Sequence, residues 1–72
     1  MLNLTGKTLL VMDRTALAAC AVRRARELGC KTIVANFYPT EASPSKQIAD
    51  IAIDIDISHT DEMLALIKEY HV

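Results

Sequence analysis

The chain has 72 residues, of which 51% are hydrophobic, and a formal net charge of −1. This length fits one small domain that buries only about 60% of the surface its unfolded form exposes, and the near-neutral charge indicates no nucleic-acid or anionic-membrane partner. With no apolar run near the ~18 residues of a membrane span, no signal-peptide pattern, and two cysteines at neither metal nor redox spacing, we expect a cytoplasmic protein.

Residues 7–36 predict one β-α-β unit. Apolar runs at Thr8–Met12 and Thr32–Asn36 are typical of buried strands. Thr15–Leu28, between them, has the periodicity of a helix. Because a helix joins the two strands, we expect them to be parallel, with a right-handed crossover.

The ends of this first helix also follow from its residues. Asp13 or Thr15 can cap its start, and Gly29 is expected in the left-handed conformation that ends it. Cys20 and Cys30 are expected to be buried as small apolar side chains. The face predicted to pack on the sheet is formed by Leu17, Ala21, Ala25 and Leu28, with Ala18 and Val22 widening it.

The second half of the chain predicts two more helices around a third strand. Pro44–Asp50 reads as a short helix with Ser43 as its N-cap, and we expect Lys46 and Gln47 on it to be exposed to solvent. The alternating run Ile51–Ile57 predicts a half-buried edge strand.

The wet face of that strand is expected to carry Asp54 and Asp56, and we expect no metal there because no third ligand lies near. A last helix follows. Ser58 and Asp61 have the spacing of a capping box, and the apolar stripe of this helix is expected to be Met63, Leu64, Ile67 and Tyr70.

These elements predict an α/β fold over residues 1–72. It is a Rossmann-like, three-layer β-α-β-α-β-α unit with a short parallel sheet of strand order 3-2-1, stopping before a fourth strand. That strand would lie beside Thr8–Met12, so one edge of Thr8–Met12 is expected to be unpaired. A homodimer through this edge, or cover by Met1–Thr5, would satisfy it.

Open parallel sheets bind ligands outside the carboxyl ends of their strands. The candidate substrate-cleft residues are therefore Asp13, Arg14, Thr15, Asn36 and Tyr38; the alternative is that they serve as caps and loop packing. The loop after the first strand has no glycine, which argues against dinucleotide or P-loop binding. We expect no catalytic residue and no metal ligand in the chain.

A family resemblance is carried by several stretches: Lys7–Val11, Ala25–Gly29, Tyr38-Pro39, Ser43–Lys46 and Ile48–Asp50. With these, the chain resembles the N-terminal pre-ATP-grasp domain of ATP-grasp ligases, in particular proteins like the large subunit of carbamoyl-phosphate synthase. The resemblance implies a longer parent enzyme that joins a carboxylate to an amine or similar nucleophile through an acyl-phosphate. It implies that ATP and Mg²⁺ bind the parent's later ATP-grasp domain, which would be this chain's partner, beside a small-molecule substrate.

The chain departs from the family at Met12-Asp13-Arg14, where the family commonly carries glycines. Two alternatives stay open. One is a free-standing Rossmann-like binding or protein-interaction module. The other is a small catalytic α/β domain, for which the sequence offers no triad, metal cluster or phosphate loop.

Overall fold

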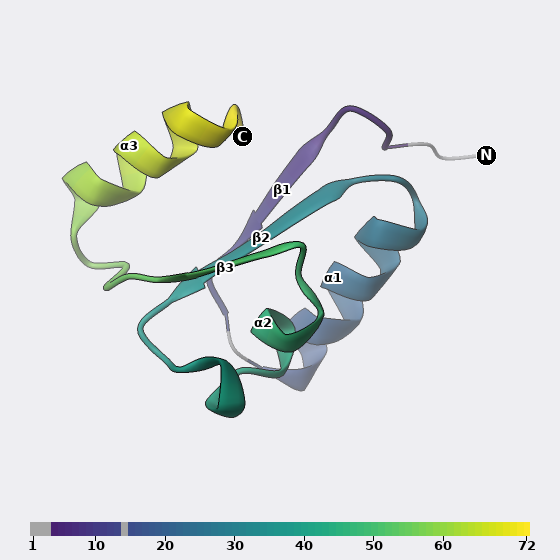
Figure 1. Cartoon of the computed structure of the whole chain (residues 1–72), viewed down its shortest axis with the longest axis horizontal. Coiled ribbons are helices and arrows are strands. Elements are labelled where there is room, and N and C mark those ends of the chain that lie inside the picture. Colours follow the sequence, from purple (N-terminus) through teal and green to yellow (C-terminus); the bar gives the residue numbers. More distant parts are fainter. Residues whose placement is uncertain (1–3, 14) are drawn as a thin grey trace.

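The computed structural model describes residues 4–13 and 15–72 and contains one parallel sheet of three strands in the order β1-β2-β3 (Figure 1). The predicted α/β class and strand order 3-2-1 are confirmed. The elements in chain order are β1 (Thr8–Val11), α1 (Ala16–Glu27), β2 (Lys31–Asn36), the 3-10 turn η1 (Thr40–Ala42), α2 (Pro44–Ile48), β3 (Ile51–Asp54) and α3 (Thr60–Tyr70).

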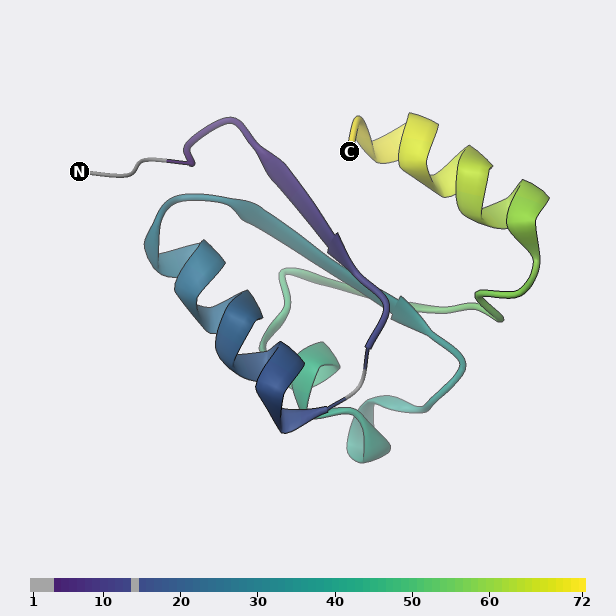
Figure 2. The same ribbon diagram turned by 180° about the vertical axis from the view of Figure 1, so that it is seen from behind.

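The helices form layers on both faces of the sheet. Figures 1 and 2 show α1 and α2 on one face and α3 on the other. The first two crossovers advance in the same direction, from β1 to β2 to β3, and right-handed crossovers of this kind place their helices on the same face. The three-layer arrangement is therefore confirmed.

The core lies around the central strand β2. Ile33, Val34 and Ala35 are fully buried there, together with Val22 of α1. The register pairs Leu10 with Ile33 and Ile33 with Ile51, so apolar side chains line up across all three strands. The edge strands are only half-buried, as expected where one side of a strand lacks a neighbour.

Both ends of α1 are closed as the sequence predicts. Thr15 Oγ1 accepts a hydrogen bond from the Ala18 N–H at 3.2 Å. At the other end Gly29 has φ +90°, and the Cys30 N–H donates to Ala25 O at 3.0 Å. This is the hydrogen bond of a Schellman motif, which satisfies a carbonyl of the last helical turn.

The predicted buried face of α1 is partly wrong. Leu17 is 81% exposed and Ala21 and Cys20 are exposed too, whereas the contact face is centred on Val22 and includes Ala18, Ala19 and Ala25. Three alanines around one valine let the helix axis approach the sheet closely. A larger leucine on that face would hold the two layers apart, so the helix turns it outward.

The third strand is shorter than predicted and ends at Asp54. Asp56 therefore does not share a strand face with Asp54. The capping box at Ser58 and Asp61 is also wrong, because α3 has His59 as its N-cap residue and Ser58 instead donates to Asp56 Oδ1 from both its N–H, at 3.0 Å, and its hydroxyl, at 2.7 Å. The local turn at Asp56 competes with the cap for the same hydroxyl.

Helix α3 covers the second face of the sheet through Met63 and Leu66, which are its buried residues. Leu64, predicted to be in the stripe, is exposed. The end of α3 is held by Lys31, whose ammonium lies 5.5 Å from the centre of the Tyr70 ring, a cation–π contact. In the part of the chain that the structure describes, no helix is long and apolar enough to cross a membrane.

Asp50 ties three elements together at the start of β3. Its Oδ2 accepts hydrogen bonds from the N–H of Thr32, at 2.8 Å, and from the Thr32 hydroxyl, at 3.0 Å. Its Oδ1 lies 3.3 Å from Arg26 Nε of α1. The Thr32 backbone and hydroxyl bonds, with help from Arg26 and Lys31, hold the pKa of Asp50 below its ordinary value despite some desolvation.

Asp50→Asn should lower the free energy of unfolding at pH 7 by roughly 1–2 kcal/mol, a hydrogen-bonded charge discounted for its partial exposure. Because the folded-state pKa is depressed, the charge stabilises the fold above the unfolded value of 3.8 and loses that effect as the pH falls through the folded value. In urea denaturation, the difference in the free energy of unfolding between wild type and variant should be smaller at pH 3 than at pH 7. Glu69→Gln, at an exposed position of α3, is the control and should show no such gap. A gap that is equal at both pH values would contradict this role.

Candidate functional site at the carboxyl edge of the sheet

The first predicted site residues lie where β1 ends. Asp13 accepts hydrogen bonds from the Thr15 N–H to Oδ1 and from the Thr15 hydroxyl to Oδ2, both at 3.1 Å. Thr15 in turn caps α1. Arg14 lies outside the described residues. Both described residues thus have the capping role that was the alternative to ligand binding, although both are exposed and lie at the predicted edge.

The next two predicted residues lie where β2 ends. Asn36 is buried, and its Oδ1 accepts a hydrogen bond from the Tyr38 N–H at 3.0 Å, which forms a local turn. That turn brings two aromatic side chains to the surface. Phe37 and Tyr38 are 74% and 42% exposed, with ring centres 6.3 Å apart and ring planes at 81°.

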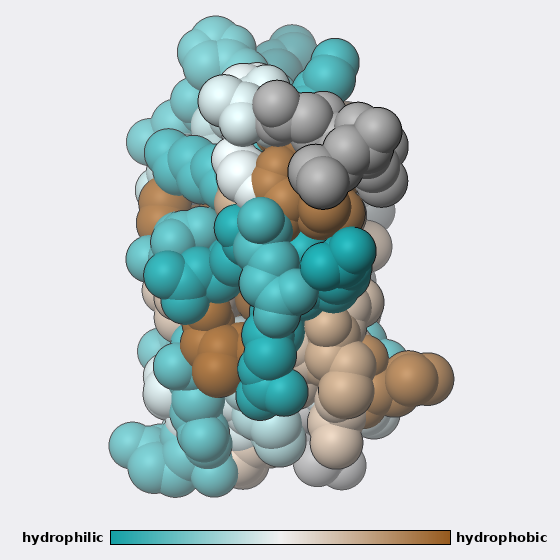
Figure 3. Space-filling model, turned by 90° about the vertical axis from the view of Figure 1, so that its right-hand side faces the viewer, coloured by the Kyte–Doolittle hydropathy of each residue, from teal (hydrophilic) through white to brown (hydrophobic). Residues whose placement is uncertain are grey.

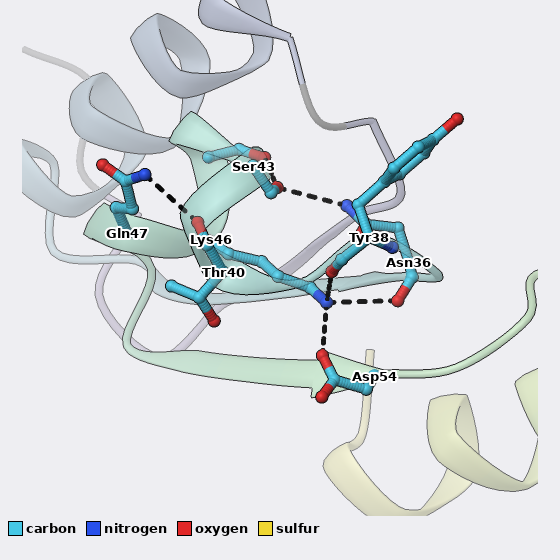
Figure 4. Close-up of polar contacts among 8 residues, drawn as sticks. Asn36, Tyr38, Thr40, Ser43, Lys46, Gln47 and Asp54 are labelled. Carbon is cyan, nitrogen blue, oxygen red and sulfur yellow. Dashed lines mark hydrogen bonds and ion pairs between the residues drawn. The ribbon is translucent and has the colours of Figure 1, made fainter.

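A residue predicted to be solvent-exposed, Lys46 of α2, is the centre of this edge. Its side chain is 0% exposed, and its ammonium donates to Asn36 O at 3.1 Å, to Tyr38 O, and to Asp54 Oδ1 at 2.6 Å. Figure 4 shows the three acceptors around the ammonium, and the ring of Tyr38 pointing away from it. An ammonium has three protons to donate, so the three acceptors account for all of them.

Two serines extend this arrangement toward β1. Ser43 Oγ accepts a hydrogen bond from Asn36 Nδ2 at 3.4 Å and lies 3.3 Å from Ser45 Oγ. Ser45 Oγ donates to the backbone oxygen of Asp13 at 2.6 Å. Ser43 is the N-cap residue of α2 as predicted, but its hydroxyl makes no capping bond because it is used here.

We call Asn36, Ser43, Ser45, Lys46 and Asp54 the carboxyl-edge network. It links the residues that follow β1 and β2 to the end of β3 through α2. Four of its five members are buried, whereas the side chain of Asp54 is 80% exposed. A buried, fully bonded network of this kind holds backbone in one arrangement, so the network fixes the loop that carries Phe37 and Tyr38.

Several large apolar side chains are exposed along this edge, beside polar ones such as Asp13 and Asp54. Met12 follows β1 and is 47% exposed, Leu17 lies in the first turn of α1, and Phe37 and Tyr38 follow β2. Exposed apolar side chains that gather at one end of a domain often mark a binding surface. The arrangement can therefore bind an apolar partner or line one wall of a cleft. In the described ranges, 4–13 and 15–72, no group of acidic, histidine or cysteine side chains is arranged to hold a metal ion.

The charged groups after β3 form a separate exposed cluster. The Ser58 hydroxyl and N–H lower the pKa of the Asp56 carboxyl, and His59 adds to this effect. His59 Nε2 lies 3.8 Å from Asp56 Oδ2, and His59 Nδ1 lies 3.4 Å from Glu62 Oε2. The two carboxylates belong to the loop and the first turn of α3, so the cluster orders the start of that helix.

A surface groove of about 380 Å³ lies between α1 and α2 and is lined by Arg23, Arg26, Glu27 and Ile48. Arg26 is already engaged there, since its Nη1 donates to Ile48 O at 2.8 Å. This bond joins α1 to α2 across the groove. Figure 3, which draws the right-hand side of the molecule in Figure 1, shows a mostly hydrophilic surface with its apolar residues in separate small groups.

The sequence analysis missed Ser43, Ser45, Lys46 and Asp54 as members of one network. A lysine on a two-turn helix is usually solvent-exposed, and the periodicity of five helical residues is too short to show which face is buried. One signal was present. Asp54 alternates with the isoleucines and shares the strand face of Ala52, so the sequence placed an acidic side chain away from the apolar face, and this side chain is the one that contacts Lys46.

Comparison with protein-family models, with curated proteins and with solved structures found no match for this chain.

Lys46→Met should lower the free energy of unfolding by about 2–4 kcal/mol, because it removes three charge-assisted hydrogen bonds from a fully buried position, to the carbonyls of Asn36 and Tyr38 and to the Asp54 carboxylate. Asp54→Asn should cost less than about 1 kcal/mol, since Asp54 is exposed and the amide oxygen of asparagine can still accept the hydrogen bond of the Lys46 ammonium. Chemical denaturation followed by circular dichroism measures both. Equal effects of the two variants would show that the ion pair, and not the carbonyl bonds, is the stabilising contact.

Proposed function

We propose that this chain is the leading domain of an ATP-grasp ligase similar to the large subunit of carbamoyl-phosphate synthase. In this proposal the domain supports the parent's nucleotide-binding domain and borders the substrate cleft with its carboxyl edge. It catalyses nothing alone. ATP and Mg²⁺ bind elsewhere in the parent, and the domain works in the cytoplasm, where ATP is made and used.

One observation carries the proposal. The stretch Ser43–Lys46 and the residue Asp50, which carry much of the family resemblance, are the ones with a defined structural task. Ser43, Ser45 and Lys46 hold the carboxyl edge together, and Asp50 ties α2 to β2. A motif whose residues organise the edge where open parallel sheets bind ligands is what a cleft-bordering domain needs.

The exposed apolar residues at the same edge support the domain-docking part of the proposal. Met12, Leu17, Phe37 and Tyr38 would be covered by a neighbouring domain in the parent. The same observation favours a second candidate, a free-standing interaction module that docks another protein on this surface. The two candidates differ in whether the covering surface belongs to the same polypeptide.

The isolated chain should not bind ATP with a dissociation constant below about 1 mM. The start of α1 is the position that would hold a phosphate in a related fold, and here the Asp13 carboxylate already accepts the Thr15 N–H. A second negative charge at that position would be repelled. Isothermal titration of the purified chain with Mg-ATP measures this, and micromolar affinity would contradict the prediction.

In the full enzyme, Tyr38→Ala should raise the KM for the non-nucleotide substrate several-fold and leave the KM for ATP unchanged, because Tyr38 lies at the sheet edge that borders the proposed cleft. Steady-state kinetics with each substrate varied in turn measures both constants. Leu64→Ala is the matched control, since Leu64 is also a large exposed apolar residue but lies on α3, on the other face of the sheet.

Sequencing the gene beyond codon 72 separates the two candidates before any kinetics. A reading frame that continues into an ATP-grasp domain supports the ligase. A stop codon after Val72 would remove the ligase and leave the interaction module. If Tyr38→Ala leaves both KM values unchanged, Tyr38 does not border the cleft. The assignment of the domain to a ligase is then still tested by the gene sequence.

A further inference from the structure

The outer edge of β1 presents backbone groups in a defined pattern. The Lys31 N–H donates to Lys7 O at 3.0 Å, and Thr8 is in register with Lys31. In a parallel ladder this geometry directs the peptide groups of residues 7, 9 and 11 toward β2. The N–H and C=O groups of Thr8 and Leu10, and of Met12 if the strand continues, therefore point away from the sheet.

This pattern is self-complementary about Leu10. If a second copy lies antiparallel to β1 with Leu10 opposite its equivalent, the two leucines exchange a pair of backbone hydrogen bonds. Thr8 of each copy then exchanges a pair with Met12 of the other. In this register every outward donor of Thr8, Leu10 and Met12 meets an acceptor of the second copy, provided that the strand extends to Met12.

The side chains in the same register also match. On one face Leu10 meets its equivalent, and on the other face Leu9 meets Val11 of the second copy. β1 ends at Val11; if the pairing extends to residues 7 and 13, Lys7 lies directly opposite Asp13 of the second copy, in the closely spaced, non-hydrogen-bonded type of pair. Both residues are exposed in the single chain. The dimer would therefore have one Lys7–Asp13 ion pair at each end of an apolar centre.

We propose that this chain forms a symmetric dimer through antiparallel β1–β1 pairing, which joins two three-stranded sheets into one of six strands. The contact is isologous, with a two-fold axis at Leu10, and closes after two copies. The described residues preceding β1 do not compete for the edge, since the Leu4 N–H donates to Leu28 O at 2.8 Å, at the end of α1. The dimer needs the outer edge of β1 without a further strand, as in the free-standing module, whereas in the proposed ligase the expected fourth strand would occupy this edge.

A charge exchange tests the register. Lys7→Glu and Asp13→Lys should each raise the dimer dissociation constant roughly tenfold, because each places like charges opposite one another twice per dimer. The double variant restores opposite charges and should return to near the wild-type value. Asp13→Lys also removes the carboxylate beside Thr15, but so does the double variant, so their comparison isolates the charge pair. Glu41→Lys makes the same charge change on η1 and should leave the constant unchanged.

Two further measurements test the edge itself. Thr8→Pro removes one outward N–H that makes no bond to β2, and it should give a monomer with unchanged circular dichroism. Amide exchange by NMR should show Leu10 N–H protected only at high chain concentration, while Leu9 and Val11 stay protected at all concentrations. Sedimentation velocity from about 5 to 500 μM covers the micromolar range expected for a small interface.

The result that supports the proposal is a dimer weakened by each single charge variant, restored by the double variant and lost in Thr8→Pro. A chain that is monomeric throughout the concentration range would overturn it. So would a dimer that ignores Thr8→Pro, which would use another surface, or a monomer with Leu10 N–H always protected, in which the chain's own N-terminal residues cover the edge.

Discussion

The arrangement of the carboxyl edge depends on one buried ammonium. Lys46 carries its positive charge into a position with no side-chain exposure, which is costly unless the charge is fully hydrogen-bonded. The bonds to the carbonyl groups of Asn36 and Tyr38 and to the carboxylate of Asp54 meet that requirement. The Asn36 carbonyl also accepts the Ile55 N–H from the β3 side at 3.0 Å, so the lysine adds a second donor where the ladder ends and extends the hydrogen bonding to the Tyr38 carbonyl beyond it.

The short helix α2 is held in place by polar contacts. From the middle of the helix Lys46 bonds to β2 and β3, and just beyond its end Asp50 joins the start of β3 to Thr32 and Arg26. A helix of five residues has almost no stability of its own. Its position therefore comes from these polar contacts and from its packing on α1, and this explains why a small domain devotes several buried polar groups to one connection.

This rigidity has a functional consequence. The loop after β2 carries two exposed aromatic rings, and its backbone is clamped by the lysine below. Aromatic side chains on a pre-organised backbone lose little conformational entropy when they bind. The domain thus presents two aromatic rings on a fixed backbone at the edge where a partner or a substrate is expected.

The sequence alone determined the order of the elements, the parallel sheet and the end of α1 at Gly29, because apolar periodicity and glycine conformation are local properties. It also placed Asp13, Thr15, Asn36 and Tyr38 at one edge, since the carboxyl ends of parallel strands must meet there. Only the tertiary structure decided that Leu17 faces solvent and that Lys46 is buried. The first depends on how closely α1 approaches the sheet, and the second on where α2 lies relative to the carbonyls at the end of β2. Both are relations between segments, which no single segment of the sequence encodes.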